Sequence, residues 1–132
     1  MASIKRIGFQ WTTGFSNVST GDGVFIPTTG WMPAADVGKA RCTWEAATEM
    51  IANMITKPGY QTANVENAPD GAVVLGTDNL ASNGVKYGSV MTDISSATQA
   101  KALVRFGIWV KLPSGSTMAN NRLAGSFDVQ SP

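Results

Sequence analysis

The clearest pattern in the chain is an alternation of apolar and polar positions over residues 102–112. Its apolar positions are Val104, Phe106, Ile108, Val110 and Leu112. Because successive side chains of a strand point to opposite faces of a sheet, these positions predict one stripe toward a core. The positions between them carry Arg105, Gly107, Trp109 and Lys111. The pattern therefore predicts a central strand whose outer face carries two cations and an indole.

The same period of two recurs over residues 3–11, 39–46 and 122–129, and shorter apolar runs lie at residues 24–26, 72–75 and 85–87. The apolar sides of the longer strands are Ile7, Phe9 and Trp11, then Ala40, Cys42, Trp44 and Ala46, and finally Leu123, Gly125, Phe127 and Val129. Short strands separated by Gly, Pro and Asn turns at spacings of roughly 8 to 12 residues are typical of sandwiches and jelly rolls. We predict an all-β fold, an antiparallel β-sandwich or jelly roll, with residues 1–132 forming a single domain because this length supports one core.

Turn residues predict how neighbouring strands connect. Asn83-Gly84 suits a tight turn and predicts a β-hairpin leading into residues 85–87. Residues 68–71, Ala-Pro-Asp-Gly, predict another turn. A further turn at residues 113–116 follows the central strand, and we expect the last strand to pair antiparallel with the central strand across it.

Residues 44–57 are ambiguous. Ala, Glu and Met favour a helix there, with Trp44, Ala47, Ile51 and Met54 on one face, while the flanking segments favour strands. The segment lacks a helix cap and continues directly from a period-two strand. We therefore favour a hairpin that turns near residues 47–49, and the helix is the alternative.

The chain carries few charges. Charged residues make up 14% of the sequence, against roughly 25% in soluble domains, and ten basic and nine acidic residues give a net charge of +1. A surface that relies on hydroxyl and amide side chains is common in extracellular β proteins and in subunits packed against neighbours, and we favour the packed subunit. Only Lys5 and Arg6 are adjacent cations, whereas nucleic-acid binders concentrate positive charge. We therefore expect no nucleic-acid partner.

The sequence also lacks the patterns that direct a chain into or across a membrane. No apolar run approaches the 18 or more residues that cross a bilayer, and the N-terminus lacks the charged-then-apolar pattern of a signal peptide. We expect no membrane partner and synthesis in the cytoplasm.

The residue types needed for most enzyme mechanisms are absent. With no histidine and Cys42 as the only cysteine, the sequence offers no Ser-His-Asp triad, no Cys/His metal site and no disulfide. Cys42 lies on an apolar stripe and is predicted to be a buried core residue. A carboxylate pair is the remaining catalytic route, drawn from Glu45, Glu49, Glu66, Asp70, Asp78 and Asp93. We expect no enzyme activity, no cofactor and no metal.

The four tryptophans differ in their context. Trp11 and Trp44 lie on apolar stripes and are predicted to be core residues, and Trp31, between Gly30 and Met32, is predicted to plug the core under a loop. Trp109 instead lies opposite the core stripe. An indole there is covered either by another part of the same chain or by a partner, and Trp and Arg are enriched at interface hot spots. Arg105, Trp109 and Lys111 are therefore our candidate interface residues, and a stacking platform for sugars is the alternative.

Several segments together resemble small β-sandwich structural proteins of tailed bacteriophages and prophages, the decoration, head and tail components of the virion. They are Gly30-Trp31-Met32-Pro33-Ala34, the strand at residues 40–46, Tyr60-Gln61-Thr62, Thr92-Asp93-Ile94-Ser95, and residues 104–112 followed by Pro-Ser-Gly-Ser-Thr. The resemblance covers residues 30–129 in composition and order, and it contains no diagnostic motif. It implies a β-sandwich that binds other subunits and the virion shell without catalysis.

Together these features predict a non-enzymatic structural subunit of a larger assembly, a bacteriophage virion component such as a capsid decoration protein. The expected partners are copies of itself, forming a homo-oligomer, and a capsid or tail shell; its expected location is the virion. The alternative is a carbohydrate-binding module that uses Trp109 or Trp31 as a stacking platform.

Overall fold

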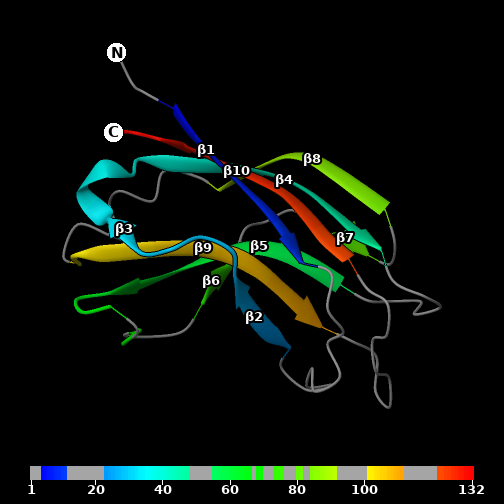
Figure 1. The fold of residues 1–132 in the computed structure, drawn as a ribbon, viewed down its shortest axis with the longest axis horizontal. Coiled ribbons are helices and arrows are strands. Elements are labelled where there is room, and N and C mark those ends of the chain that lie inside the picture. The colour runs from blue at the N-terminus through cyan, green and yellow to red at the C-terminus, as the bar shows by residue number, and fades with distance from the viewer. Residues whose placement is uncertain are drawn as a thin grey trace.

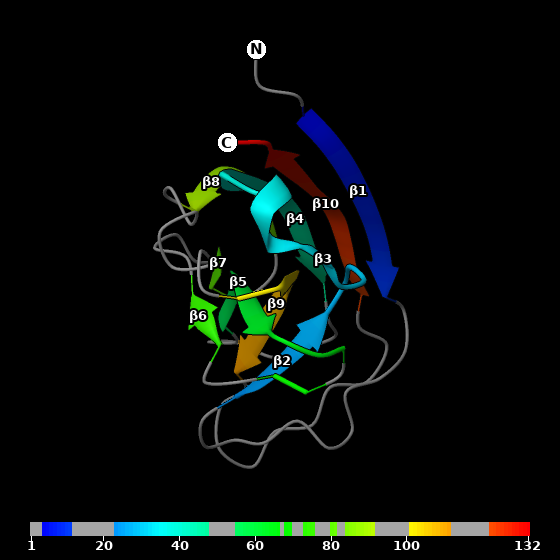
Figure 2. The ribbon, with the colours of Figure 1, turned by 90° about the vertical axis from the view of Figure 1, so that its left-hand side faces the viewer.

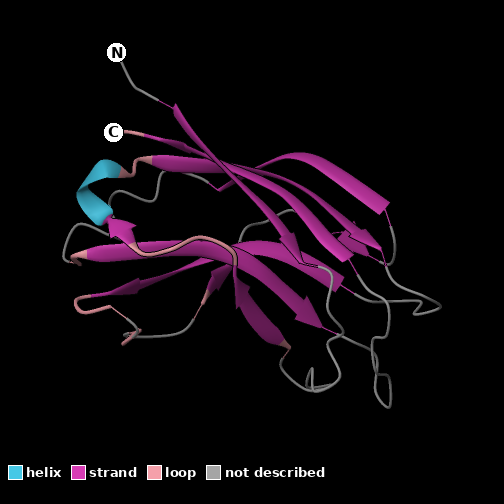
Figure 3. Ribbon diagram, viewed as in Figure 1, coloured by secondary structure: helices cyan, strands magenta, loops and turns pink. Residues whose placement is uncertain are grey.

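A computed structural model of the 132-residue chain describes residues 4–11, 23–47, 55–66, 68–69, 73–75, 80–81, 84–91, 101–111 and 122–132. Within these ranges nearly all regular structure is β-strand, with one short 3-10 helix, η1 (Ala34–Asp36) (Figure 3). The strands are β1 (Ile4–Trp11), β2 (Val24–Pro27), β3 (Met32–Pro33), β4 (Lys39–Ala47), β5 (Ile55–Ala63), β6 (Val74–Leu75), β7 (Leu80–Ala81), β8 (Gly84–Met91), β9 (Leu103–Lys111) and β10 (Arg122–Gln130). No helix in this described part of the chain is long and apolar enough to cross a membrane.

The strands form two antiparallel sheets that lie one over the other (Figures 1 and 2). Sheet 1 has the order β1-β10-β4-β8. Sheet 2 has the order β2-β9-β5-β6, with β3 also pairing with β9 and β7 with β5. The start of β1 and the end of β10 lie side by side, with Ile4 opposite Gln130. The first residue of β1 and the last residue of β10 therefore lie at the same end of the sandwich (Figure 1).

The strand pairs are nested as in a jelly roll. The first strand pairs with the last, β2 pairs with β9, β4 pairs with β8, and β5 pairs with β6 and β7. A long hairpin rolled around a core gives this nesting, and it places β1 and β4 in one sheet but β2 and β5 in the other. The expected antiparallel β-sandwich of the jelly-roll type is confirmed.

Alternation along each long strand fills the space between the sheets. On β9 the side chains of Val104, Phe106, Ile108 and Val110 are each 0% exposed. Sheet 1 contributes Ala40, Cys42 and Trp44 from β4, and Leu123, Phe127 and Val129 from β10, all of them buried. The predicted buried positions of these residues, Cys42 among them, are therefore confirmed. Gly125 is only partly buried, and the side chains of Trp11 and Ala46 lie outside what the structure describes. Leu112 lies outside the described residues.

Two kinds of contact join the sheets across this core. The rings of Phe106 on β9 and Phe127 on β10 have centroids 5.4 Å apart, within the range of favourable aromatic pairs. The indole Nε1 of Trp44 on β4 donates a hydrogen bond of 2.8 Å to Oγ1 of Thr56 on β5. Both residues are almost fully buried, so this bond satisfies two polar groups that would otherwise destabilise the core.

The predicted pairing of the last strand with the central strand is wrong. β9 lies in sheet 2 between β2 and β5, whereas β10 lies in sheet 1 between β1 and β4. The strands themselves lie where the alternation predicted them. A jelly roll sends successive long strands to opposite sheets, so the turn residues at 113–116, which lie outside the described residues, do not join paired neighbours.

The two other predicted hairpins are wrong for the same reason. β7 pairs with β5 and β8 pairs with β4, so the Asn83-Gly84 signal does not join two paired strands, although the strand predicted at residues 85–87 is present. β4 and β5 likewise lie in different sheets. A helix over residues 44–57 is also contradicted, because β4 extends to Ala47 and β5 begins at Ile55. Residues 48–54 lie outside the described residues.

Candidate interaction surface

The candidate interface residues share the outer face of β9. Their neighbours Val104, Phe106, Ile108 and Val110 point into the core, so Arg105, Trp109 and Lys111 point away from it. Each of the three is partly buried rather than fully exposed. The structure therefore brings the predicted residues together on one face of sheet 2, and their partners there determine what this face can contact.

Arg105 is held by two neighbours. Its Nε donates a hydrogen bond of 3.0 Å to Oε1 of Gln61, the residue directly opposite on β5. Its guanidinium carbon lies 4.4 Å from the centroid of the Trp31 ring, in cation–π geometry. The prediction that Trp31 plugs the core is therefore wrong: its indole contacts Arg105 on the outer face, because the chain from β2 to β3 runs beside β9.

Trp109 has a cation of its own. Lys57 lies opposite Trp109 on β5, and its Nζ is 5.8 Å from the centroid of the indole ring. Gly23, just before β2, lies so close that a Cβ atom built there would be 2.6 Å from three atoms of that ring. Its φ of 79° also favours glycine. Residues of the same chain therefore contact the indole from two strands.

Glycine lies between these two groups. Gly107 separates Arg105 from Trp109 on β9, and a Cβ atom there would lie 2.7 Å from Cζ of Phe25. The close approach of β2 therefore requires glycine at position 107. The resulting surface alternates aromatic rings with cations, and the segment from Gly23 to Trp31 contributes much of it. Two explanations were predicted for how the indole of Trp109 is covered. One of them, coverage by the same chain, accounts for part of the burial of this indole.

Sequence reasoning missed two members of this surface, Lys57 and Gln61, and it placed Trp31 on a surface only in the carbohydrate-binding alternative. Lys57 and Gln61 are recognised only once β5 is paired with β9, since each lies opposite an outer-face residue of β9. Their spacing of four places them on one side of a strand, and that was the available signal. Trp31 has no periodic context, so no pattern placed it.

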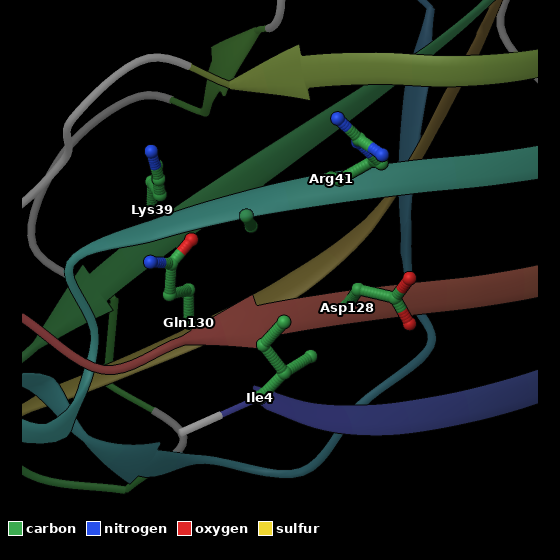
Figure 4. A pocket seen from close by; sticks show the side chains of 6 residues that line it. Ile4, Lys39, Arg41, Asp128 and Gln130 are labelled. Atoms are coloured by element: carbon green, nitrogen blue, oxygen red, sulfur yellow. The ribbon is translucent and has the colours of Figure 1, made fainter. Parts of the chain in front are cut away.

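A second feature lies on the outer face of sheet 1 (Figure 4). A shallow hollow of about 210 Å³ opens there between β1, β10 and β4. Its lining residues are Ile4, Lys39, Ala40, Arg41, Asp128 and Gln130. Two adjacent rows of the sheet form it, because Ile4, Gln130 and Lys39 are cross-strand neighbours, as are Arg6, Asp128 and Arg41.

An ion pair organises the second of these rows. Nε of Arg6 donates to Oδ1 of Asp128 at 2.8 Å, and its Nη2 donates to Oδ2 at 3.2 Å. These hydrogen bonds, together with the charges of Arg6 and Arg41, lower the pKa of the Asp128 carboxyl below its ordinary value. Asp128 is therefore ionised at neutral pH, and its charge is directed to Arg6.

The described residues offer little for catalysis. Burial, and to a smaller extent the charge of Asp128, raises the pKa of the Cys42 thiol, so the thiolate needed for nucleophilic attack is disfavoured. Of the six candidate carboxylates, the structure describes Glu45 on β4 and Glu66 after β5, which belong to different layers. No group of three metal-binding side chains occurs among the described residues.

No protein-family model matches the sequence, and no curated protein matches it either. Solved structures do match the fold. A structure of the Gx strain of infectious bursal disease virus superposes with a TM-score of 0.60 at 12% identity, covering 98% of this chain and 32% of that chain. The VP2 subviral particle of the same virus gives a TM-score of 0.61 at 13% identity, covering 98% and 33%.

T=1 particles derived from this virus give a TM-score of 0.59 at 12% identity. The chain thus spans about a third of the length of the structures that it matches. At such low identity the similarity concerns the fold alone. It places nearly the whole chain in the same kind of jelly roll as a part of these larger virus-particle chains.

Proposed function

We propose that this protein is a non-enzymatic structural subunit of a virus particle, where it packs against other protein subunits. The observation that carries the proposal is the jelly-roll fold, whose similarity to structures of virus particles covers 98% of this chain. The low charge of 14% supports it, because much of a packed subunit's surface is covered by neighbours. The absence of histidine from the sequence supports a role other than catalysis.

The narrower part of the proposal is a decoration, head or tail component of a tailed bacteriophage. The resemblance of residues 30–129 to such proteins supports this narrower assignment. In that role the protein would form a homo-oligomer, bind a capsid or tail shell, and be located in the virion.

Arg105, Trp109 and Lys111 are the proposed contact residues on sheet 2. Aromatic and arginine side chains are enriched at interface hot spots, and here the hydrogen bond that Arg105 donates to Gln61 and its cation–π contact with Trp31 hold Arg105 in one orientation. A side chain already fixed in the free subunit loses less conformational freedom when a partner binds. This fixed orientation of Arg105 supports the proposed contact of sheet 2 with a protein partner.

The test is the sedimentation of the purified protein, followed by electron microscopy of the assembled fraction. We expect concentration-dependent oligomers or shells, and Trp109→Ala should weaken association by about 2 kcal/mol or more if the indole is a hot spot. Gln10→Ala, at an exposed position of sheet 1, is the matched control and should leave association unchanged. A wild-type protein that stays monomeric and binds no shell would contradict the proposal.

The same variant separates the remaining roles of Trp109. If Trp109→Ala unfolds the isolated subunit, the indole serves packing within the chain and is not an interface residue. If neither folding nor association responds, retention of the wild-type protein on a glycan array, lost in the variant, would favour the carbohydrate-binding alternative.

A further inference from the structure

The hollow on sheet 1 gathers positive charge that is dispersed in the sequence. Lys39 and Arg41 are exposed on its rim, while Asp128, the one carboxylate among its described lining residues, is engaged by Arg6 from the neighbouring strand. Ile4, at the edge of the hollow, is a large apolar residue that is 69% exposed. The hollow therefore presents an apolar contact beside an excess of positive charge.

The size of the hollow limits its occupant. Pockets for small-molecule ligands are usually about 300–1,000 Å³, and this hollow has about 210 Å³ on an open sheet face. It has room for one or two side chains of another protein. A fitting occupant carries a carboxylate next to an aliphatic side chain.

The described part of this chain presents such a pair of side chains after β5. Val65 is 67% exposed and Glu66 is exposed next to it. The N–H of Ala68 donates a hydrogen bond of 3.2 Å to the carbonyl of Val65, which closes a turn, and a bridge between Ala63 and Pro69 fastens its base. The turn thus presents an exposed aliphatic group next to an exposed carboxylate.

We propose that the sheet-1 hollow receives the turn with Val65 and Glu66 of a second copy of this chain. In this contact Glu66 lies against Arg41 and Lys39, and Val65 lies against Ile4. The proposal rests on the proposed function as a particle subunit, and it names the contact through which copies join. Charge complementarity between the two exposed features selects a second copy as the occupant.

The contact has a geometric consequence. The hollow belongs to sheet 1 and the turn follows a strand of sheet 2, so each copy uses two different patches. A contact between different patches is heterologous, and repetition closes it into a ring if the rotation permits. The surface around Arg105 and Trp109, on the other sheet, stays available for a second contact.

Charge reversal provides the test, measured as sedimentation of the full chain at moderate salt. Arg41→Glu and Glu66→Arg each place like charges at the contact, and each should raise the dissociation constant of self-association by about tenfold or more. Gln10→Glu adds a negative charge at the far end of the same sheet face and is the control, with no expected change. Circular dichroism verifies that each variant is folded. If the Arg41→Glu variant does not fold, the Lys39→Glu variant takes its place in the test.

Mixing the two variants gives the sharpest result. In the mixture, the hollow of the Arg41→Glu variant carries an added negative charge and can receive the positively charged turn of the Glu66→Arg variant. The unchanged hollow of the Glu66→Arg variant can receive the unchanged turn of the Arg41→Glu variant. An equimolar mixture should therefore recover association through contacts between the two variants, while each variant alone stays dissociated. The chain that carries both substitutions should assemble like the wild type.

Two results would overturn the inference, and they are distinguishable. If the wild type assembles and both single variants assemble equally well, copies join elsewhere, the hollow has another occupant or none, and the proposed function stands. If the wild type is monomeric at all concentrations and binds no shell, the inference and the proposed function fail together.

Discussion

The outer face of sheet 1 is charged and open, whereas the outer face of sheet 2 carries aromatic side chains that residues of the same chain contact. On sheet 1, the Arg6 row is followed by small side chains, Gly8, Ser126 and Thr43, in one cross-strand row. On sheet 2, indole rings lie against Arg105 and Lys57. Both sheets nevertheless bury their inner faces by the same alternation.

This difference shows that different requirements determine the residues of the inner faces and those of the outer faces. The inner faces must fill one core, and buried apolar area provides most of the stability. The outer faces are free to differ, and here sheet 1 leaves a shallow charged hollow while β2 and the residues around it crowd sheet 2. Substitutions at matched positions can therefore show which contacts serve folding and which are left for partners.

The largest expected effect comes from Trp44, which joins the inner faces of both sheets. Trp44→Ala should lower the free energy of unfolding by about 3–5 kcal/mol, because it leaves a cavity in the core. Trp44→Phe keeps most of the packing but removes the hydrogen bond to Thr56, and should cost about 1–3 kcal/mol. Urea denaturation followed by circular dichroism measures both, and a Trp44→Phe variant as stable as the wild type would show that the bond between the sheets contributes nothing.

Substitutions of Cys42 test the packing of the inner face of sheet 1 alone. Cys42→Ser should destabilise the protein by about 1–3 kcal/mol, because it places a hydroxyl in an apolar site that is 0% exposed. Cys42→Ala is the control for the loss of the sulfur itself. Rapid reaction of the native protein with a thiol reagent would contradict the burial of this side chain.

The alternation of side chains allowed the strands and their buried faces to be predicted. β1, β4, β9 and β10 lie where the period of two placed them, because this pattern reports directly which side of a sheet is buried. It does not report which strand lies alongside. The turn after β9 therefore suggested a local hairpin, while the actual partners of β10 are β4 and β1, the latter more than 100 residues away in the chain.

The candidate surfaces were predictable only where one strand carries them. Arg105, Trp109 and Lys111 follow from the register of β9 alone. Lys39, Arg41 and Arg6 come together only because β10 lies between β4 and β1, so no local pattern links them. Trp31 stands alone between Gly30 and Met32, and its contact with Arg105 depends on the path of the chain from β2 to β3.

Substitutions at two glycines compare how crowded the outer faces of the two sheets are. Gly23→Ala should destabilise the protein by about 1–2 kcal/mol, because a left-handed backbone disfavours a side chain and the new methyl group would displace the ring of Trp109. Gly8→Ala is the matched change on sheet 1, where the nearest atom is 3.8 Å away. It should be neutral or stabilise by up to about 1 kcal/mol, because alanine lowers the entropy of the unfolded chain. Thermal unfolding compares the two, and equal losses would mean that the outer face of sheet 1 is as crowded as that of sheet 2.

The smallest effect is expected from the ion pair on the outer face of sheet 1. Hydrogen bonds from Arg6 lower the pKa of Asp128 in the folded protein, so the pair stabilises the fold at pH values above the ordinary carboxyl pKa of about 3.9. This contribution is lost as the pH falls through the lowered pKa. The side chain of Arg6 is 74% exposed, so water and salt screen the pair and the gain in stability is small.

Asp128→Asn should therefore melt slightly below the wild type at neutral pH, and the difference should vanish in acid and shrink in high salt. Arg6→Gln is the reciprocal variant and should give the same pH profile, because it removes the donor that lowers the pKa. Melting curves collected from neutral pH into acid provide the measurement. A difference that stays constant into strong acid would mean that Asp128 acts through the packing of its side chain and not through its charge.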